Sequence, residues 1–201
     1  MLGIYERSIQ TILYNSLFQG SVFYDIGANN GFFSLLSCEL TGPSGFTYCF
    51  EPHPLIIKML RVNLEKNEFS NYKIIQQAVS EENASKQLFF SGEGNQPRSS
   101  LIETGDNKWV EVKTITLDSF LFNNRIPDLV KIDVEGAELR VLNGAYNLIR
   151  SDPRPAWLVE IHSLALDQAV RQMFTDHGYV VNEISADKHS GRQYPLHILA
   201  D

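Results

Sequence analysis

The 201-residue chain has few cysteines and no long apolar segment. Its two cysteines, Cys38 and Cys49, lie among apolar neighbours, so we expect buried free thiols and not the disulfide framework of a small secreted protein. No apolar stretch approaches the ~20 residues that span a bilayer, and no cationic start followed by an apolar run indicates a signal peptide. These absences predict a cytoplasmic protein without a membrane span.

Basic residues are also scarce: 17 lysines and arginines face 24 acidic residues, which gives a formal net charge of -7. Proteins that bind nucleic acids usually neutralise phosphates with clustered basic side chains, so a nucleic-acid partner is disfavoured. Hydrophobic residues make up 43% of the chain and charged residues 20%, which is typical of a globular protein. The length predicts one domain spanning residues 1–201.

Apolar segments alternate between strand and helix patterns along most of the chain. An N-terminal helix is expected within residues 1–20. The expected strands are 21–28, 46–50, 72–79, 129–136 and 157–162, and the further helices are 32–40, 55–67, 137–149 and 164–176. This alternation predicts an α/β fold with a doubly wound, mainly parallel sheet covered on both faces. Two last strands, 179–184 and 194–199, are expected to form an antiparallel pair.

The alternation is interrupted at residues 80–117, between the third strand and the strand that begins at residue 129. Two strands, 87–90 and 110–115, flank a polar loop over residues 91–108, which predicts a β-hairpin insertion. Long loops inside compact domains are often functional. The loop is therefore either a surface connection or a lid that contacts the substrate.

A glycine-containing turn, Asp25-Ile-Gly-Ala-Asn-Asn-Gly31, follows the first strand, where cofactors bind in open α/β sheets. Glu51 ends the next strand and is suited to accept hydrogen bonds from ribose hydroxyls. The turn is not G-x-G-x-x-G, and Asp25 would repel a pyrophosphate. The pattern therefore favours S-adenosylmethionine, which carries an ammonium and a sulfonium, over a nicotinamide cofactor.

These segments, together with Gln77-Ala-Val-Ser80, Lys131-Ile-Asp-Val-Glu-Gly-Ala-Glu138 and Val159-Glu-Ile-His162, resemble the FkbM family of S-adenosylmethionine-dependent methyltransferases. The resemblance covers residues 20–179. It implies the class I methyltransferase (Rossmann-like) fold, with sheet order 3-2-1-4-5-7-6 and an antiparallel C-terminal strand. It also implies O-methylation of a hydroxyl on a sugar, glycan or small metabolite.

The resemblance also assigns the cofactor-binding residues by position. Asp25, Gly27, Asn29 and Gly31 would surround the methionine moiety, Glu51 would hold the ribose, and Gln77 and Ala78 would flank the adenine. Ala28, Pro52 and Asp133 complete the expected set.

Four ionisable residues at the ends of the fourth and fifth strands are the catalytic candidates: Asp133, Glu135, Glu160 and His162. Methyl transfer to a hydroxyl needs a base, and alternation along the strand places Glu160 and His162 on one side. Asp133 and Glu135 are alternatively helix caps, and His162 is alternatively a structural histidine. Glu160 would orient His162, contact the cofactor amine or bind a metal; for Mg²⁺, Asp133 and Glu160 are the candidate ligands.

Three questions stay open at this level. The chain could be a nicotinamide-dependent oxidoreductase, or a catalytically silent scaffold that binds a cofactor for a partner. The acceptor half of the site could be completed by loop 91–108 or by a second subunit in a homodimer. The acceptor itself is not specified, because substrate choice depends on loops carried by a shared fold.

Overall fold

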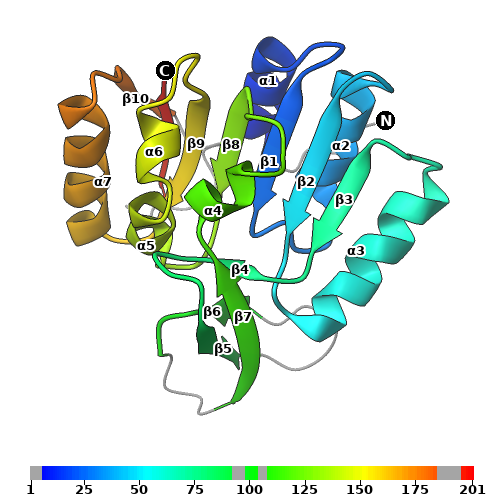
Figure 1. The fold of residues 1–201 in the computed structure, drawn as a ribbon, viewed down its shortest axis with the longest axis horizontal. Helices are drawn as coiled ribbons and strands as arrows, with labels where there is room; N and C mark the ends of the chain where they lie inside the picture. The colour runs from blue at the N-terminus through cyan, green and yellow to red at the C-terminus, as the bar shows by residue number, and fades with distance from the viewer. Residues whose placement is uncertain (1–5, 92–97, 104–107, 185–195) are drawn as a thin grey trace.

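A seven-stranded sheet runs through the centre of the molecule (Figure 1). The computed structural model describes residues 6–91, 98–103, 108–184 and 196–201. The sheet consists of β1 (Val22–Ile26), β2 (Phe46–Phe50), β3 (Tyr72–Ile75), β8 (Leu129–Ile132), β9 (Ala156–Ile161), β10 (Val181–Ile184) and β11 (Leu196–Ala200). Their order is β10-β11-β9-β8-β1-β2-β3, and β11 is antiparallel to both of its neighbours. The expected doubly wound sheet, its strand order and its antiparallel last strand are confirmed.

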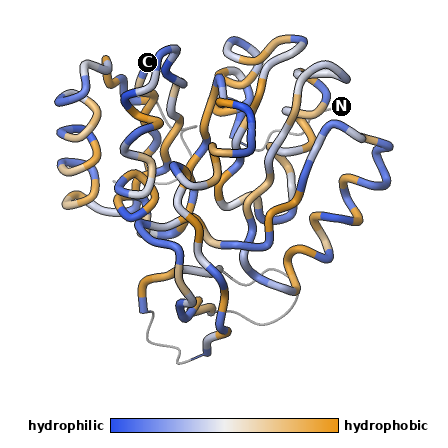
Figure 2. Tube along the Cα trace, viewed as in Figure 1, coloured by the Kyte–Doolittle hydropathy of each residue, from blue (hydrophilic) through white to orange (hydrophobic). Residues whose placement is uncertain are grey.

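Helices cover both faces of this sheet. One face carries α1 (Arg7–Ser16), α2 (Phe32–Thr41) and α3 (Pro54–Lys66), and the other carries α4 (Leu117–Leu121), α5 (Glu138–Asn143), α6 (Tyr146–Ile149) and α7 (Leu164–Asp176). In β1, Phe23 packs into the core on the first side and Tyr24 into the core on the second. Figure 2 shows hydrophobic residues recurring along the strands and along α3 and α7. Burial on both faces explains why the central strands are almost continuously apolar.

The insertion is a second, smaller sheet below the carboxyl ends of the central strands (Figure 1). It contains β4 (Ala78–Val79), β5 (Ser85–Ser91), β6 (Arg98–Ser100) and β7 (Trp109–Ile115), in the order β4-β7-β5-β6. The expected third strand over 72–79 is wrong in its second half, because β4 leaves the main sheet and pairs with β7. The expected loop is also wrong in part, because β6 lies within it and pairs with β5.

The expected helix over residues 137–149 is interrupted at Gly144. A Cβ at this position would lie 2.1 Å from the carbonyl oxygen of Ser80. Only glycine, which has no Cβ, therefore allows the backbone at residue 144 to approach Ser80 this closely. The carboxylate of Asp118 accepts hydrogen bonds from the backbone N–H groups of Asn147 and Leu148. These contacts start α6 as a separate helix.

Other expectations concern the cysteines, the membrane and the chain termini. Cys38 and Cys49 are free and buried, as expected. None of the helices in the described ranges has the length and apolar character that crossing a membrane requires. Residues 92–97 and 104–107 of the expected loop, and residues 194–195 of the expected last strand, lie outside the described residues, as do residues 1–5.

Candidate active site

The turn after β1 depends on glycine for close contacts within the protein itself. Gly27 has φ 80°, and a Cβ there would lie 1.9 Å from the carbonyl oxygen of Asp133. Gly31 has φ 90°, and its Cβ would lie 2.5 Å from a methyl group of Leu60. The family resemblance placed both glycines around the methionine moiety of the cofactor. The structure shows that they let β8 and α3 approach the turn, and the ligand crevice lies beside it.

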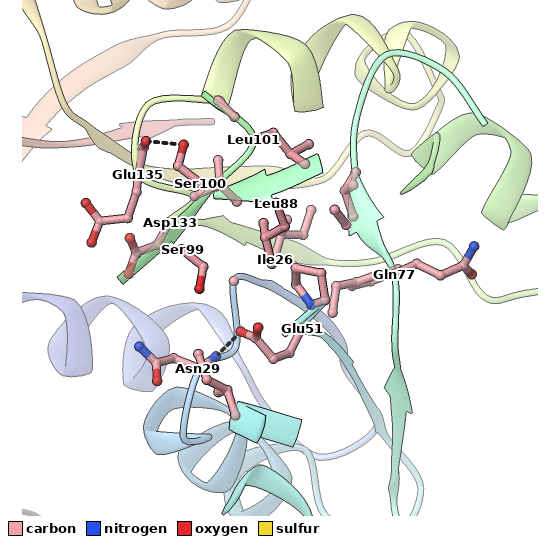
Figure 3. Close-up of a pocket in the computed structure, with 18 residues that line it drawn as sticks. Ile26, Asn29, Glu51, Gln77, Leu88, Ser99, Ser100, Leu101, Asp133 and Glu135 are labelled. Carbon is pink, nitrogen blue, oxygen red and sulfur yellow. Dashed lines mark hydrogen bonds between the residues drawn. The ribbon is translucent and has the colours of Figure 1, made fainter. Parts of the chain in front are cut away.

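Glu51 is buried at the end of β2 and is held by two backbone donors. Its Oε2 accepts a hydrogen bond from Asn29 N at 3.1 Å (Figure 3), and its Oε1 accepts one from His53 N at 2.8 Å. Burial raises the pKa of Glu51 to about 7, although these two hydrogen bonds oppose the shift. The carboxylate is fixed in place and keeps unused lone pairs for a ligand.

Two cavities meet at the carboxyl edge of the sheet. The first cavity is lined by expected cofactor residues and by part of the insertion, including Gly27, Asn29, Glu51, Pro52, Gln77, Ala78, Ser99, Ser100, Leu101 and Asp133 (Figure 3). The second cavity is lined by Gly27, Ala28, Asn29, Asn30, Phe32, Phe33, Lys131 and Asp133. Gly27, Asn29 and Asp133 border both cavities, so the two cavities are adjacent. The side chain of Gln77 points away from the first cavity in Figure 3.

Asp25 and Gly31 line neither cavity. The Asp25 side chain is buried in β1, where it accepts a hydrogen bond from Ser34 Oγ at 2.6 Å. Lys131 Nζ lies 3.8 Å from Asp25 Oδ1 and 3.3 Å from Asp133 Oδ2. Since Lys131 compensates its charge, Asp25 does not by itself make the crevice attractive to a cation. The paired Asp25 therefore favours a cationic cofactor less than an unpaired carboxylate would.

Four carboxylates, which we call the acid cluster, surround His162: Asp133, Glu135, Glu138 and Glu160. His162 Nδ1 lies 2.6 Å from Glu138 Oε1. His162 Nε2 lies 3.4 Å from Glu135 Oε2 and 3.7 Å from Glu160 Oε1. The fold therefore brings together the four ionisable residues that the sequence placed at two strand ends, and it adds Glu138 as a fifth.

Charges within the cluster shift each other's titration. Burial alone would lower the pKa of His162, but the hydrogen bond and charge of Glu138 and the charges of Glu160 and Asp133 raise it to about 9. Burial raises the pKa of Asp133 above its ordinary value, although Lys131 opposes the shift. For Glu160, burial is outweighed by His197, Lys131 and His162, which lower its pKa. At neutral pH His162 is therefore mainly an imidazolium, and Asp133 takes up a proton more readily than an exposed aspartate does.

The turn after β8 carries two of these acids. Glu135 has φ 51°, a conformation uncommon for residues other than glycine, and its carbonyl oxygen accepts a hydrogen bond from Ser100 Oγ at 2.8 Å. The N-cap of α5 is Ala137, without a side-chain cap. The capping alternative for Asp133 and Glu135 is therefore not supported. Strain at Glu135 is instead consistent with a functional turn.

Sequence reasoning missed three residues of this site: Lys131, Glu138 and His197. Lys131 stands out as a charge within the apolar β8, and Glu138 belongs to the motif that begins there. Either could have been selected on that ground, since buried charges need partners. His197 Nε2 lies 3.4 Å from Glu160 Oε2, because β11 pairs His197 directly with Glu160. Only the register of that strand pair reveals this contact.

Asp133, Glu160 and His162 also offer donor atoms that all lie within 4.8 Å of one another. Two carboxylates and an imidazole are a donor set that a divalent cation accepts. His162, however, has a raised pKa, and a metal would have to displace its proton. The geometry permits a metal ion without requiring one.

A family model and several solved structures are similar to this chain. The methyltransferase FkbM domain model matches residues 25–181. The structure of the FkbM methyltransferase from Methylobacillus flagellatus KT is similar with a TM-score of 0.68 at 15% identity, over 94% of this chain and 48% of that one. This chain thus spans about half the length of that protein.

Two further structures have the same fold at lower identity. An S-adenosylmethionine-dependent O-methyltransferase from Thermotoga maritima gives a TM-score of 0.63 at 11% identity, over 100% of this chain and 66% of that one. A methyltransferase from Streptococcus mutans, solved with S-adenosylhomocysteine, gives 0.62 at 10% identity, over 96% and 95% of the two chains. A comparison with curated protein sequences gave no match. On the family model and the class I methyltransferase fold, the chain belongs to the FkbM methyltransferase family.

Proposed function

We propose that this chain is an S-adenosylmethionine-dependent O-methyltransferase whose acceptor is a hydroxyl of a sugar, glycan or small metabolite. The observation that carries the proposal is the position of Asp133. It borders both cavities, and its pKa is raised above the ordinary value. A base near neutrality at the junction of two ligand cavities is what hydroxyl methylation requires.

The residues of the two cavities fit the cofactor. The first cavity has the Glu51 carboxylate for two ribose hydroxyls and the apolar side chains of Ile56, Leu88 and Leu101 for the adenine. The second cavity has the Lys131 ammonium for the methionine carboxylate. In this arrangement Gly27, Asn29 and Asp133, which border both cavities, would hold the central part of the cofactor, which carries the sulfonium and its methyl group.

The reaction is an in-line displacement in which S-adenosylmethionine supplies an activated methyl group. The acceptor oxygen would form a bond to the methyl carbon as the carbon–sulfur bond breaks, and the electron pair of that bond would stay on sulfur. Asp133 takes the proton from the acceptor hydroxyl. The raised pKa of His162 keeps it mainly protonated at neutral pH, which favours Asp133 over it as the base, and its positive charge offsets the charges of Glu135, Glu138 and Glu160 beside it.

The acid cluster favours a polyhydroxylated acceptor. Carboxylates such as Glu135 and Glu160 accept hydrogen bonds from several hydroxyls at once. A phosphate-rich acceptor such as RNA would meet these negative charges at close range, and the chain carries a net charge of -7. The charge distribution thus supports a neutral hydroxyl acceptor over a nucleic acid.

The experiment that tests the function has two arms. Acceptor pools of sugars, glycans and small metabolites are incubated with the protein and S-adenosylmethionine labelled in the methyl group, and we expect label in a hydroxyl-bearing product. Calorimetric titration with S-adenosylhomocysteine follows, and Glu51→Ala should weaken binding strongly. Unchanged binding in Glu51→Ala would refute the cofactor assignment.

Two alternatives are tested with the same protein. A nicotinamide-dependent oxidoreductase would show a fluorescence change on titration with NADH, whereas we expect none. A silent scaffold would bind S-adenosylhomocysteine but label none of the acceptors. A homodimer that completes the acceptor half remains a prediction, and analytical ultracentrifugation checks it.

A further inference from the structure

Strand β6 contributes to the first cavity a hydroxyl that the mechanism above does not use. Ser99 lines this cavity from the insertion, on the side that faces Glu51 (Figure 3). In the pairing of β5 with β6, Ser99 lies opposite Phe90. The Phe90 ring packs edge-on against His53, with centroids 5.1 Å apart, two residues beyond Glu51. The position of Ser99 is therefore tied to the segment that carries Glu51.

The two adjacent serines of β6 differ in their hydrogen bonds. Ser100 Oγ donates to the carbonyl oxygen of Glu135 at 2.8 Å and accepts from Ile102 N at 3.0 Å. Ser99 Oγ is inaccessible to solvent and has no hydrogen-bond partner within the described ranges. In Figure 3 it points into the space between Glu51 and Asp133. Ser100 therefore has a structural role, whereas Ser99 has a buried hydroxyl directed at the cavity.

A buried hydroxyl without a partner is unfavourable, and natural proteins contain few of them. Where one faces a ligand cavity, a bound ligand is the group that can complete it. A hydroxyl both donates and accepts, so it can pair with a ribose hydroxyl or with an adenine nitrogen. Both groups belong to the adenosyl part of the proposed cofactor, which Glu51 places in the first cavity.

We propose that Ser99 Oγ forms a hydrogen bond to the adenosyl part of the cofactor, so that the insertion recognises the cofactor directly. This inference rests on the proposed function, because it requires the adenosyl group to occupy the first cavity. On this proposal β6 contributes to cofactor affinity, whereas the acid cluster contacts the acceptor.

Calorimetric titration of the full chain with S-adenosylhomocysteine tests the proposal. Loss of one neutral hydrogen bond predicts a Kd about three- to tenfold higher for Ser99→Ala. The melting temperature of the ligand-free variant should be unchanged or higher, because the substitution removes an unpaired buried hydroxyl. A Kd equal to wild type would overturn the proposal, and so would a lower melting temperature of the free variant, which indicates a structural partner.

Two controls separate this proposal from the function on which it rests. Ser85→Ala changes an exposed serine in β5 of the same insertion and should leave the Kd unchanged. If Glu51→Ala weakens binding and Ser99→Ala does not, the role of Ser99 alone is refuted. If Glu51→Ala binds as wild type does, the cofactor does not occupy the first cavity and both proposals fail.

Discussion

The turns after β1 and β8 lie side by side at the carboxyl edge of the sheet, and they are built by different means. The first turn, residues 27–31, has two glycines and is defined by backbone contacts to β8, α3 and Glu51. The second turn, residues 133–136, has two acids and belongs to a network of charged side chains. The first turn thus depends on close backbone packing and the second on charged side chains. Substitutions in the first should therefore lower stability, and substitutions in the second should change titration and catalysis.

Gly27→Ala should produce the largest effect. Its Cβ would lie 1.9 Å from the Asp133 carbonyl oxygen at φ 80°, and backbone strain and the clash together predict a loss of about 3 kcal/mol or more in the free energy of unfolding. Denaturant unfolding measures it. Gly136→Ala is the matched control: φ is 99° but the nearest atom is 3.9 Å away, so about 1 kcal/mol is expected. Equal losses in both variants would show that strain alone matters.

Asp133→Asn should affect catalysis and not the fold. Removing the proposed base predicts a decrease in kcat of about 100-fold or more, with the affinity for S-adenosylhomocysteine within a few-fold of wild type. Steady-state kinetics on the acceptor found by screening, together with calorimetry, measures both. A variant that keeps wild-type kcat would assign proton removal to another group.

His162 should make stability pH-dependent. Its pKa in the folded state, about 9, lies above the ordinary 6.5, so the stabilisation is complete below about pH 6.5 and is lost as the pH rises through 9. Since His162 is partly exposed, the loss should be about 1–3 kcal/mol. Melting temperatures from pH 6 to 10 measure it against His162→Gln, which should lack this loss. His177→Gln, outside the acid cluster, should retain it.

Glu51 should make cofactor affinity pH-dependent through the first turn. With a pKa of about 7 in the free protein, Glu51 becomes protonated as the pH falls, and a neutral carboxyl accepts ribose hydrogen bonds poorly. The Kd for S-adenosylhomocysteine should rise up to about tenfold per pH unit below pH 7. Calorimetry between pH 5.5 and 8 measures the slope, and Glu51→Ala should show a flatter one.

Chelation should have the smallest effect. If His162 remains protonated beside Asp133 and Glu160, activity measured in EDTA equals activity without it. If EDTA abolishes activity and Mg²⁺ restores it, these three residues bind a metal ion. His162 would then be a neutral ligand and would not supply the positive charge that offsets the acids of the second turn.

Much of the fold could be predicted from the sequence, since strand and helix patterns alternate clearly and the family resemblance supplies the sheet order. Glu51 and the acids at the ends of β8 and β9 were also found, because parallel strands bring their carboxyl ends to one edge. β6 was missed because its strand pairing occurs within a polar, irregular segment. The break at Gly144 was missed because it depends on contact with Ser80, which is 64 residues away in sequence.

The charge partners of the site were harder to predict. Lys131 contacts Asp25 because β8 and β1 pair these residues in register, and His197 contacts Glu160 in the same way across β9 and β11. A sequence indicates that a charge is buried more readily than it indicates which neighbour balances it. The contact of Glu138 with His162, which raises the pKa of His162, was likewise not predicted, and a role of His162 as a base stays an untested prediction.

The acid cluster also bears on how a reaction cycle ends. In the proposed reaction the sulfonium becomes a neutral thioether, so the bound nucleoside loses one positive charge at each turnover. In the same step Asp133 takes up the proton of the acceptor, so the attraction between its carboxylate and the sulfonium is lost. On the proposed function, Asp133 is therefore expected to hold S-adenosylhomocysteine less tightly than S-adenosylmethionine, which would favour release of the product after methyl transfer.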